Sequence, residues 1–218
     1  MNNLNLSRPD GRTYRILCLG AHSDDIEIGC GGTILSLLGQ FAEVSVRWVV
    51  FSSDETRAQE ARKSADAFLA RASSRTVIVR DHRDGFFPFL GARIKEEFEA
   101  LRRDFDPDLV FTHYRDDRHQ DHRLISDLTW NTFRDHLVLE YEIPKYDGDL
   151  GTPNFFVPID EEICTLKVRN LLEHFPSQGG KRWFDEQTFL SLMRIRGIES
   201  NSPSRYAEAF HCRKVVLA

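Results

Sequence analysis

Residues 14–29 read YRILCLGAHSDDIEIG, an apolar run that stops at a glycine and is followed at once by a histidine and two adjacent carboxylates. Residues 14–19 have the pattern of a short buried strand, which Gly20 ends. In open α/β sheets, ligands bind in the crevice at the carboxyl ends of the strands. This stretch therefore predicts a sheet strand with candidate functional residues at its end.

Two periodicities alternate outward from this stretch. Apolar and β-branched runs predict further strands at residues 44–51, 76–79, 108–112 and 137–143. Helical patterns separate them at residues 32–38, 55–72, 92–104 and 120–133. Strands that alternate with helices predict an α/β fold, a Rossmann-like three-layer sandwich with a mostly parallel central sheet.

The last third of the chain departs from this alternation. It predicts helices at residues 161–174 and 185–196, a polar turn over 176–181 and a terminal strand at 213–217. No linker is visible, so we expect residues 1–218 to form a single domain. Residues 152–218 lie outside the alternating unit and are expected to shape specificity.

Composition excludes several classes of protein. The 218 residues are 41% hydrophobic and 29% charged, which is ordinary for a globular protein and excludes a wholly disordered chain. A formal charge of −5 is a poor match for a polyanion, so no nucleic-acid partner is expected. No run approaches the roughly 20 apolar residues of a transmembrane helix, and no secretory signal is visible. Four scattered cysteines without a CxxC pair favour a cytoplasmic location. The oligomeric state stays open.

A second polar cluster, residues 113–122 (HYRDDRHQDH), follows the strand predicted at 108–112. His22 and Asp25 are three residues apart, as are His119 and His122, so one helical turn would bring each pair to one side. Imidazole nitrogen and carboxylate oxygen suit Zn²⁺ or another borderline divalent metal.

These two clusters can be interpreted in two ways. A single H-x-x-D pattern is more often a capped turn, and a carboxylate after a strand is an ordinary helix N-cap. Two such clusters at two strand ends instead favour a metal site. Catalytic zinc usually has three protein ligands and a water, whose proton Asp24 could accept.

Five motifs, in order, carry a resemblance to a known family. Residues 22–33 (HSDDIEIGCGGT) resemble the HPDD(A)EIGxGGT signature of the PIG-L/LmbE-like N-deacetylases, zinc-dependent enzymes that hydrolyse the acetamide of N-acetylglucosaminyl and related amino sugars. The other four segments resemble the family's HxDH, R-x-x-E, H-x-S-Q and Y-A-E-A-F motifs; they are residues 119–122, 57–60, 174–178 and 206–210. The likeness covers most of the chain from about residue 16 to 210. The combination of motifs is specific, although no single motif would be.

The resemblance implies three zinc ligands, which are His22, Asp25 and His122. It implies Asp24 as the general base. Protonated His119 would stabilise the oxyanion and protonate the departing amine, with Asp121 holding that histidine in orientation. Ser23 stands where the family usually has proline, a change that removes no ligand or base.

Three more residues are candidates for binding the substrate. Arg57 could bind a hydroxyl, carboxylate or phosphate, and His174 and Gln178 could line the sugar pocket. The alternatives are a solvated helix face for Arg57 and a helix end for the other two. The glycine-rich stretch at residues 29–32 fits no phosphate-loop pattern, and we interpret it as allowing close backbone approach beside the metal loop.

We therefore expect a metal-dependent hydrolase, with Zn²⁺ or another divalent metal, that removes the acetyl group from an N-acetylated amino sugar or sugar conjugate. One alternative is a phospho-receiver domain, in which Asp54 and Lys145 would join Asp24 and Asp25, but that role leaves the histidines unused. Another is a catalytically silent metal-binding partner protein, against which the presence of Asp24 and His119 argues. The sequence leaves the sugar and its carrier group open.

Overall fold

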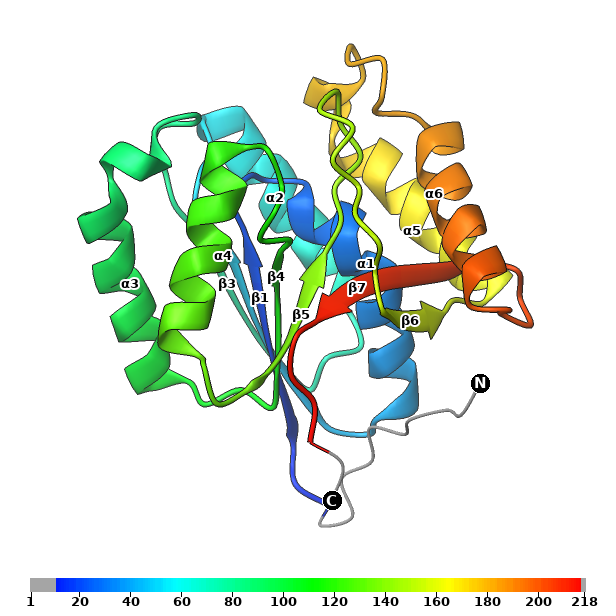
Figure 1. Cartoon of the computed structure of the whole chain (residues 1–218), viewed down its shortest axis with the longest axis horizontal. Helices are drawn as coiled ribbons and strands as arrows, with labels where there is room; N and C mark the ends of the chain where they lie inside the picture. The colour runs from blue at the N-terminus through cyan, green and yellow to red at the C-terminus, as the bar shows by residue number, and fades with distance from the viewer. Residues whose placement is uncertain (1–10, 217–218) are drawn as a thin grey trace.

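The structure, a computed structural model, describes residues 11–216 (Figure 1). Seven strands in this part of the chain form one sheet in the order β3-β2-β1-β4-β5-β7-β6. Their bounds are β1 Tyr14–Gly20, β2 Val44–Val50, β3 Ser74–Val79, β4 Leu109–His113, β5 Leu137–Tyr141, β6 Phe155–Pro158 and β7 Ala207–Cys212. Strands β1 to β5 pair in parallel, and β7 runs antiparallel to both β5 and β6. The mostly parallel α/β sheet predicted from the sequence is confirmed.

Helices cover both faces of this sheet (Figure 1). They are α1 Asp25–Gln40, α2 Glu55–Phe68, α3 Gly91–Asp104, α4 Gln120–Thr132, α5 Glu161–His174 and α6 Glu186–Glu199, with the short 3₁₀ turns η1 Phe87–Phe89 and η2 Pro176–Gln178. In Figure 1, α3 and α4 lie on one side of the sheet, and α1 and α5 lie on the other.

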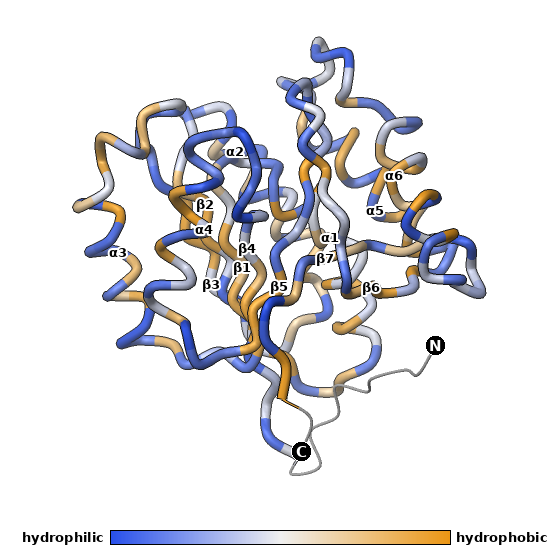
Figure 2. Tube along the Cα trace, in the orientation of Figure 1, coloured by the Kyte–Doolittle hydropathy of each residue, from blue (hydrophilic) through white to orange (hydrophobic). Residues whose placement is uncertain are grey.

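Strand β1 supplies residues to two hydrophobic cores, one on each face of the sheet. Ile16 and Cys18 pack in the core that includes residues of α1, α2, α5 and α6. Leu17 and Leu19 pack in the second core, together with residues of α3 and α4. Successive side chains of a strand point to opposite faces, so a strand that is buried on both faces is apolar at nearly every position. Figure 2 shows this concentration of hydrophobic residues along the central strands.

The terminal strand predicted at residues 213–217 is wrong. Among the described residues the last strand is β7, which ends at Cys212. Residues 213–216 lie outside any strand, and residue 217 lies outside the described part of the chain. Strand β6 was not predicted at all. A buried glutamate, Glu208, interrupts the apolar pattern of β7, whereas Val215 and Val216 are exposed and resemble a strand only in composition.

Helix α1 begins seven residues before its predicted start at residue 32, since its first residue is Asp25. The glycine-rich stretch, which we predicted to allow close backbone approach beside the metal loop, therefore lies inside a helix. A Cβ atom at Gly29 would overlap the ring of Tyr141, and one at Gly31 would lie 2.6 Å from Cε1 of Phe68. These glycines allow α1 to pack closely against β5 and α2.

The half-buried ring of His211 in β7 should make the stability depend on pH. It stacks on Tyr114 with ring centroids 3.7 Å apart, and burial, followed by the charge of Arg196, lowers its pKa to about 4. In the unfolded chain the same histidine has a pKa of about 6.5. Unfolding therefore takes up a proton between these two values, and the free energy of unfolding falls as the pH drops from about 6.5 to 4.

We expect this histidine to account for a loss of about 1 kcal/mol between pH 8 and pH 5, after an allowance for its partial exposure. Urea unfolding of the wild type and of His211→Gln at both pH values tests this expectation. The loss between the two pH values should be smaller in the variant, whatever its stability at pH 8. Equal losses in the two proteins would show that His211 titrates normally in the folded state.

Candidate active site

The two polar clusters lie together because β1 and β4 are neighbours in the sheet. Residues 21–25 follow the carboxyl end of β1, and residues 114–119 lead from β4 into α4. Because the strands are parallel, both segments lie at the carboxyl edge of the sheet. Ligands bind in the crevice at this edge, as the sequence predicts. Nδ1 of His22 lies 3.1 Å from Nε2 of His122, although the two residues are a hundred positions apart.

The three predicted metal ligands converge on one point. Besides the 3.1 Å between His22 and His122, Oδ2 of Asp25 lies 3.4 Å from His22 Nδ1 and 3.6 Å from His122 Nε2. All three side chains are buried. A tetrahedral zinc ion with bonds of 2.0–2.1 Å places its ligand atoms about 3.3 Å apart. The donor set and its spacing therefore fit one zinc-sized ion.

Asp25 and Asp24 occupy different environments at the start of α1. Burial acts to raise the pKa of Asp25, but the imidazoles of His122, His113 and His22 outweigh it and hold that pKa well below its usual range. Asp24 is the N-cap residue, and its Oδ1 accepts a hydrogen bond of 2.8 Å from Nη2 of Arg57. Burial raises the pKa of Asp24 even though Arg57 opposes the shift. Asp25 is thus a permanent anion, and Asp24 is the more basic carboxylate.

Asp117, to which the sequence analysis gave no role, holds His122 in place. Its Oδ2 lies 2.9 Å from His122 Nδ1 and accepts a hydrogen bond of 2.9 Å from Lys145, while its Oδ1 accepts one of 2.8 Å from the backbone of His119. A carboxylate at Nδ1 fixes the proton there and leaves the Nε2 lone pair facing the metal position. The contact crosses from a loop to a helix, so no sequence spacing reports it.

Replacing Asp117 with asparagine should weaken zinc binding by 10- to 100-fold, the usual effect of removing such an outer carboxylate. Competition with a chromophoric chelator measures the change in dissociation constant. Asp149→Asn is the matched control, because Asp149 also accepts from Lys145, at 2.7 Å, whereas the carboxylate at His122 Nδ1 is that of Asp117. Equal zinc affinity in the wild type and Asp117→Asn would exclude this role.

His119 is the N-cap residue of α4, and its half-buried ring faces the same cleft. Its ring packs edge-on against His22 and stacks on His122, with centroids 4.8 and 4.6 Å apart. Burial, and then the charge of His22, lower the pKa of His119. This shift favours the neutral ring over the protonated form that the family resemblance implies.

The expected contact between the carboxylate of Asp121 and the ring of His119 is replaced by others. Asp121 accepts hydrogen bonds from the backbone N–H groups of Gly85, at 2.6 Å, and Phe87, at 3.0 Å, and its Oδ2 lies 3.4 Å from Nε2 of His22. Only the backbone N–H of Asp121 reaches the His119 ring, donating to Nδ1 over 3.3 Å. Residues two apart do not face each other on a helix, and this explains the difference. Asp121 therefore orients His22.

Two further residues at the site were not singled out from the sequence. Asp84 places Oδ1 3.0 Å from Nε2 of His22, and Nε2 of His113 lies 3.2 Å from Oδ2 of Asp25. His113 was quoted only as part of its cluster. Asp84 follows β3, whose carboxyl end borders the same edge of the sheet, and this position is the signal that could have identified it.

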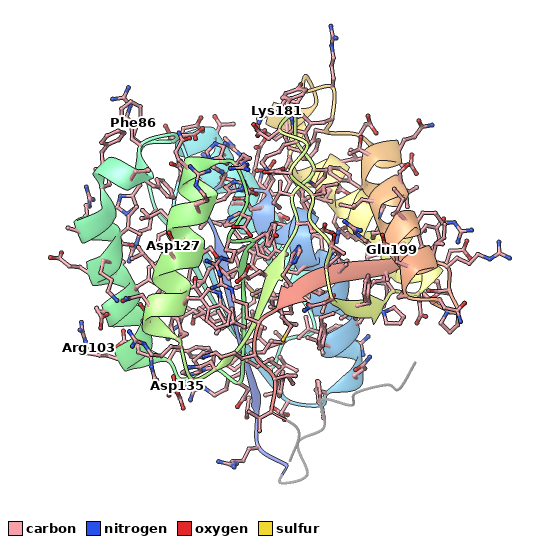
Figure 3. The ribbon with its side chains drawn as sticks, viewed as in Figure 1. Phe86, Arg103, Asp127, Asp135, Lys181 and Glu199 are labelled. Atoms are coloured by element: carbon pink, nitrogen blue, oxygen red, sulfur yellow. The ribbon has the colours of Figure 1, made fainter. Side chains whose placement is uncertain are left out.

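A cleft of about 280 Å³ is lined by six of the residues at the site, which are His22, Asp24, Asp25, Asp84, His119 and His122. Arg57 lies in its wall, together with Lys181, labelled in Figure 3, and Trp183, which both come from the segment between η2 and α6. His174 and Gln178 are not among the lining residues. Gln178 is buried and donates to Oγ of Ser177 over 2.9 Å. The structure thus brings one of the three predicted substrate-binding residues to the cleft.

The R-x-x-E and H-x-S-Q segments contact each other. Glu60 of α2 accepts hydrogen bonds from the backbone N–H and the hydroxyl of Ser177, at 2.9 and 2.5 Å. This contact ties α2, which carries Arg57, to the turn that precedes Lys181. Asp54, the acceptor in the receiver alternative, caps α2 by accepting from the backbone of Arg57 and does not line the cleft.

Histidines and carboxylates that converge at the carboxyl edge of a mostly parallel sheet define an α/β protein with a candidate metal site. The family model described as PIG-L: GlcNAc-PI de-N-acetylase matches residues 17–133, more than half of the chain. The chain belongs to this family of deacetylases, as its sequence motifs predicted.

Known proteins similar to this chain include one curated relative and several solved structures. The "Uncharacterized deacetylase YaiS" of Escherichia coli (strain K12) is 26% identical over 173 residues, which are 73% of this chain and 89% of that protein. The N,N'-diacetylchitobiose deacetylase of Pyrococcus horikoshii superposes with a TM-score of 0.70 at 22% identity, over 95% of this chain and 86% of that one.

The same fold also serves a different reaction. GalB of Pseudomonas putida KT2440, a 4-carboxy-2-hydroxymuconate hydratase, superposes with a TM-score of 0.69 at 16% identity, over 94% of this chain and 98% of that one. Likeness at these identities shows the fold alone, so the activity has to be argued from the site. No helix among the described residues is long and apolar enough to cross a membrane.

Proposed function

We propose that this protein is a zinc-dependent N-deacetylase that hydrolyses the acetamide of an N-acetylated amino sugar or sugar conjugate. The observation that carries the proposal is the convergence of His22, Asp25 and His122, whose facing atoms lie 3.1–3.6 Å apart beside the buried carboxylate of Asp24. Three ligands leave a fourth position open, as in catalytic zinc sites. A zinc ion held there would polarise the acetamide carbonyl and lower the pKa of a water molecule to about 7.

Asp24 acts as the general base in this proposal. It accepts a proton from the attacking water while the water oxygen forms a bond to the acetamide carbon. Arg57 holds the carboxylate at Oδ1, which leaves Oδ2 for the proton. As the carbon–nitrogen bond breaks, the proton passes from Asp24 to the departing amine. The products are acetate and a free amino group on the sugar.

His119 stabilises the developing oxyanion. Its Nδ1 accepts from the backbone N–H of Asp121, so in the neutral ring Nε2 carries the proton and can donate it in a hydrogen bond. A lowered pKa is compatible with this role, because a neutral imidazole is still a donor. We therefore retain His119 as oxyanion stabiliser and assign the return of the proton to Asp24.

The segment from residue 152 to 218 shapes specificity in this proposal. It contributes Lys181 and Trp183 to the wall of the cleft, and Lys181 lies 5.4 Å above the Trp183 ring. An indole face is a suitable platform for the apolar face of a sugar ring. Direct contact with the substrate is assigned to Arg57 and to these two residues.

Release of acetate tests the proposed function. The zinc-loaded protein is incubated with N-acetylglucosamine in free, nucleotide-linked and lipid-linked form and with N,N'-diacetylchitobiose, and acetate and free amine are both measured. We expect equal amounts of the two products from at least one substrate, loss of the activity with a chelator and its recovery with added zinc. Zinc-loaded protein that releases no acetate from any of them would favour the catalytically silent alternative.

A further inference from the structure

A buried ion pair makes hydrogen bonds to the backbone of α1. Lys167 of α5 and Glu208 of β7 lie with Nζ and Oε1 2.6 Å apart, and each side chain is only 3% exposed. Glu208 accepts hydrogen bonds from the backbone N–H groups of Gly32, at 2.8 Å, and Thr33, at 2.7 Å. Lys167 donates to the carbonyl oxygen of Ile28 over 2.7 Å.

Two of these backbone groups, the N–H of Gly32 and the carbonyl of Ile28, are ones that a regular α-helix pairs with each other. The N–H of residue 32 would donate to the carbonyl of residue 28. Here the ion pair engages both members of that pair, one through the carboxylate and the other through the ammonium group. Gly32 makes room for it, since a Cβ atom at this position would lie 2.9 Å from Oε1 of Glu208. Charged side chains therefore hold the backbone of α1 through both of these groups.

The Lys167–Glu208 pair is connected to the site through one turn of helix. The backbone N–H of Ile28 donates to the carbonyl of Asp24 over 3.1 Å, and the carbonyl of Ile28 accepts from Lys167. The turn between these two bonds contains Asp25, the proposed zinc ligand. An ion pair removed from water contributes little to stability beyond what apolar residues of the same size would give. Its position at this turn indicates a different role.

We propose that Lys167 and Glu208 are positioning residues, which hold the first turn of α1 so that Asp24 and Asp25 keep their places around the metal. The inference rests on the proposed zinc site. It also gives a role to the Y-A-E-A-F segment, because Glu208 is its glutamate. Neither residue lines the cleft, so both act through α1.

The chain offers a matched control for this proposal. Arg196 of α6 and Glu142, just after β5, form a second buried ion pair, with side chains 7% and 3% exposed and with Nε donating to Oε2 over 2.9 Å. Besides Glu142, Arg196 donates to Glu199 and to the carbonyl oxygen of Gly151, and these acceptors lie outside α1. Breaking the control pair should destabilise the fold by a similar mechanism, through an unpaired buried charge, without loosening the turn that carries Asp25.

The experiment compares Glu208→Gln, Lys167→Met and the control Glu142→Gln with the wild type, at a temperature well below the lowest Tm. Zinc dissociation constants come from chelator competition, and amide hydrogen exchange reports on residues 25–33. In both Glu208→Gln and Lys167→Met we expect zinc binding to be about 10-fold weaker and amide exchange in the first turn of α1 to be faster. We also expect a lower kcat with KM nearly unchanged. Glu142→Gln should change Tm but leave zinc affinity within about threefold.

The possible outcomes separate this inference from the proposed function. If the wild type binds zinc but Glu208→Gln and Lys167→Met bind it equally well, the inference is overturned and the pair is merely structural. It is also overturned if Glu142→Gln weakens zinc binding as much as they do. If Glu208→Gln does not fold, Lys167→Met decides, because it keeps the length of the side chain and leaves the Glu208 hydrogen bonds to α1 in place. Absence of zinc binding in the wild type would instead contradict the proposed function.

Discussion

Replacing Asp24 with asparagine should lower kcat by about 100- to 10,000-fold while the protein keeps its zinc. This is the range that a positioned general base contributes to catalysis. Asparagine has the same shape and can still accept from Arg57, but it cannot take a proton from water. Asp24 is not one of the three converging donors, so zinc affinity should stay within a few fold. Acetate release and zinc content are both measured, on protein of verified Tm.

A carboxylate elsewhere at a helix start provides the control for this variant. Asp54 is the N-cap residue of α2 as Asp24 is of α1, but it does not line the cleft. Asp54→Asn should therefore retain kcat, with at most about 1 kcal/mol of lost stability. A turnover of Asp24→Asn within threefold of the wild type would remove Asp24 from the role of base. Loss of zinc together with activity would place it among the metal ligands instead.

How far the sequence predicts the fold depends on how locally each element is determined. Residues 161–174 are predicted as a helix and form α5 with the same bounds, because the apolar spacing and the following proline are local signals. The start of α1 is missed because glycines disfavour a helix by about 1 kcal/mol each. The glycines are nevertheless helical, because α1 packs against Tyr141 and Phe68 and its backbone is held by the Lys167–Glu208 ion pair. None of these contacts is visible in the local sequence.

The candidate site, like the fold, is predicted only where local sequence determines it. Spacing pairs His22 with Asp25 and His119 with His122, but only the pairing of β1 with β4 explains why His22 meets His122. The contacts that hold the ligands in place could not be predicted. Asp117, for example, lies in the loop before α4 and contacts His122 within that helix. Asp121 was assigned to the wrong histidine because the direction of a side chain in the first turn of α4 is set by the loop that it binds. Residue identities thus predict the chemistry, and tertiary contacts decide which groups are paired.

Replacing His122 with alanine should remove both the zinc and the activity. The variant lacks one of three donors and leaves the Asp117 carboxylate beside an empty position, with Lys145 as its remaining side-chain partner. Without the metal, the pKa of water returns from about 7 to its much higher value in bulk solution, and the carbonyl loses its polarising charge. We therefore expect turnover to fall by at least about 1,000-fold and zinc content to fall from about one ion per chain to a small fraction of that.

His136→Ala is the control, because it also replaces a histidine with alanine but at a position away from the cleft. The Nε2 atom of His136 lies 3.1 Å from Oδ1 of Asp106, and this variant should leave turnover and zinc content unchanged. The comparison with Asp24→Asn then distinguishes binding from catalysis, since one variant loses the metal and the other retains it while losing turnover. If His122→Ala kept a full complement of zinc, the ion would have to be held elsewhere. The Asp24 carboxylate would then have no metal-activated water to deprotonate, and the proposed mechanism would fail at its first step.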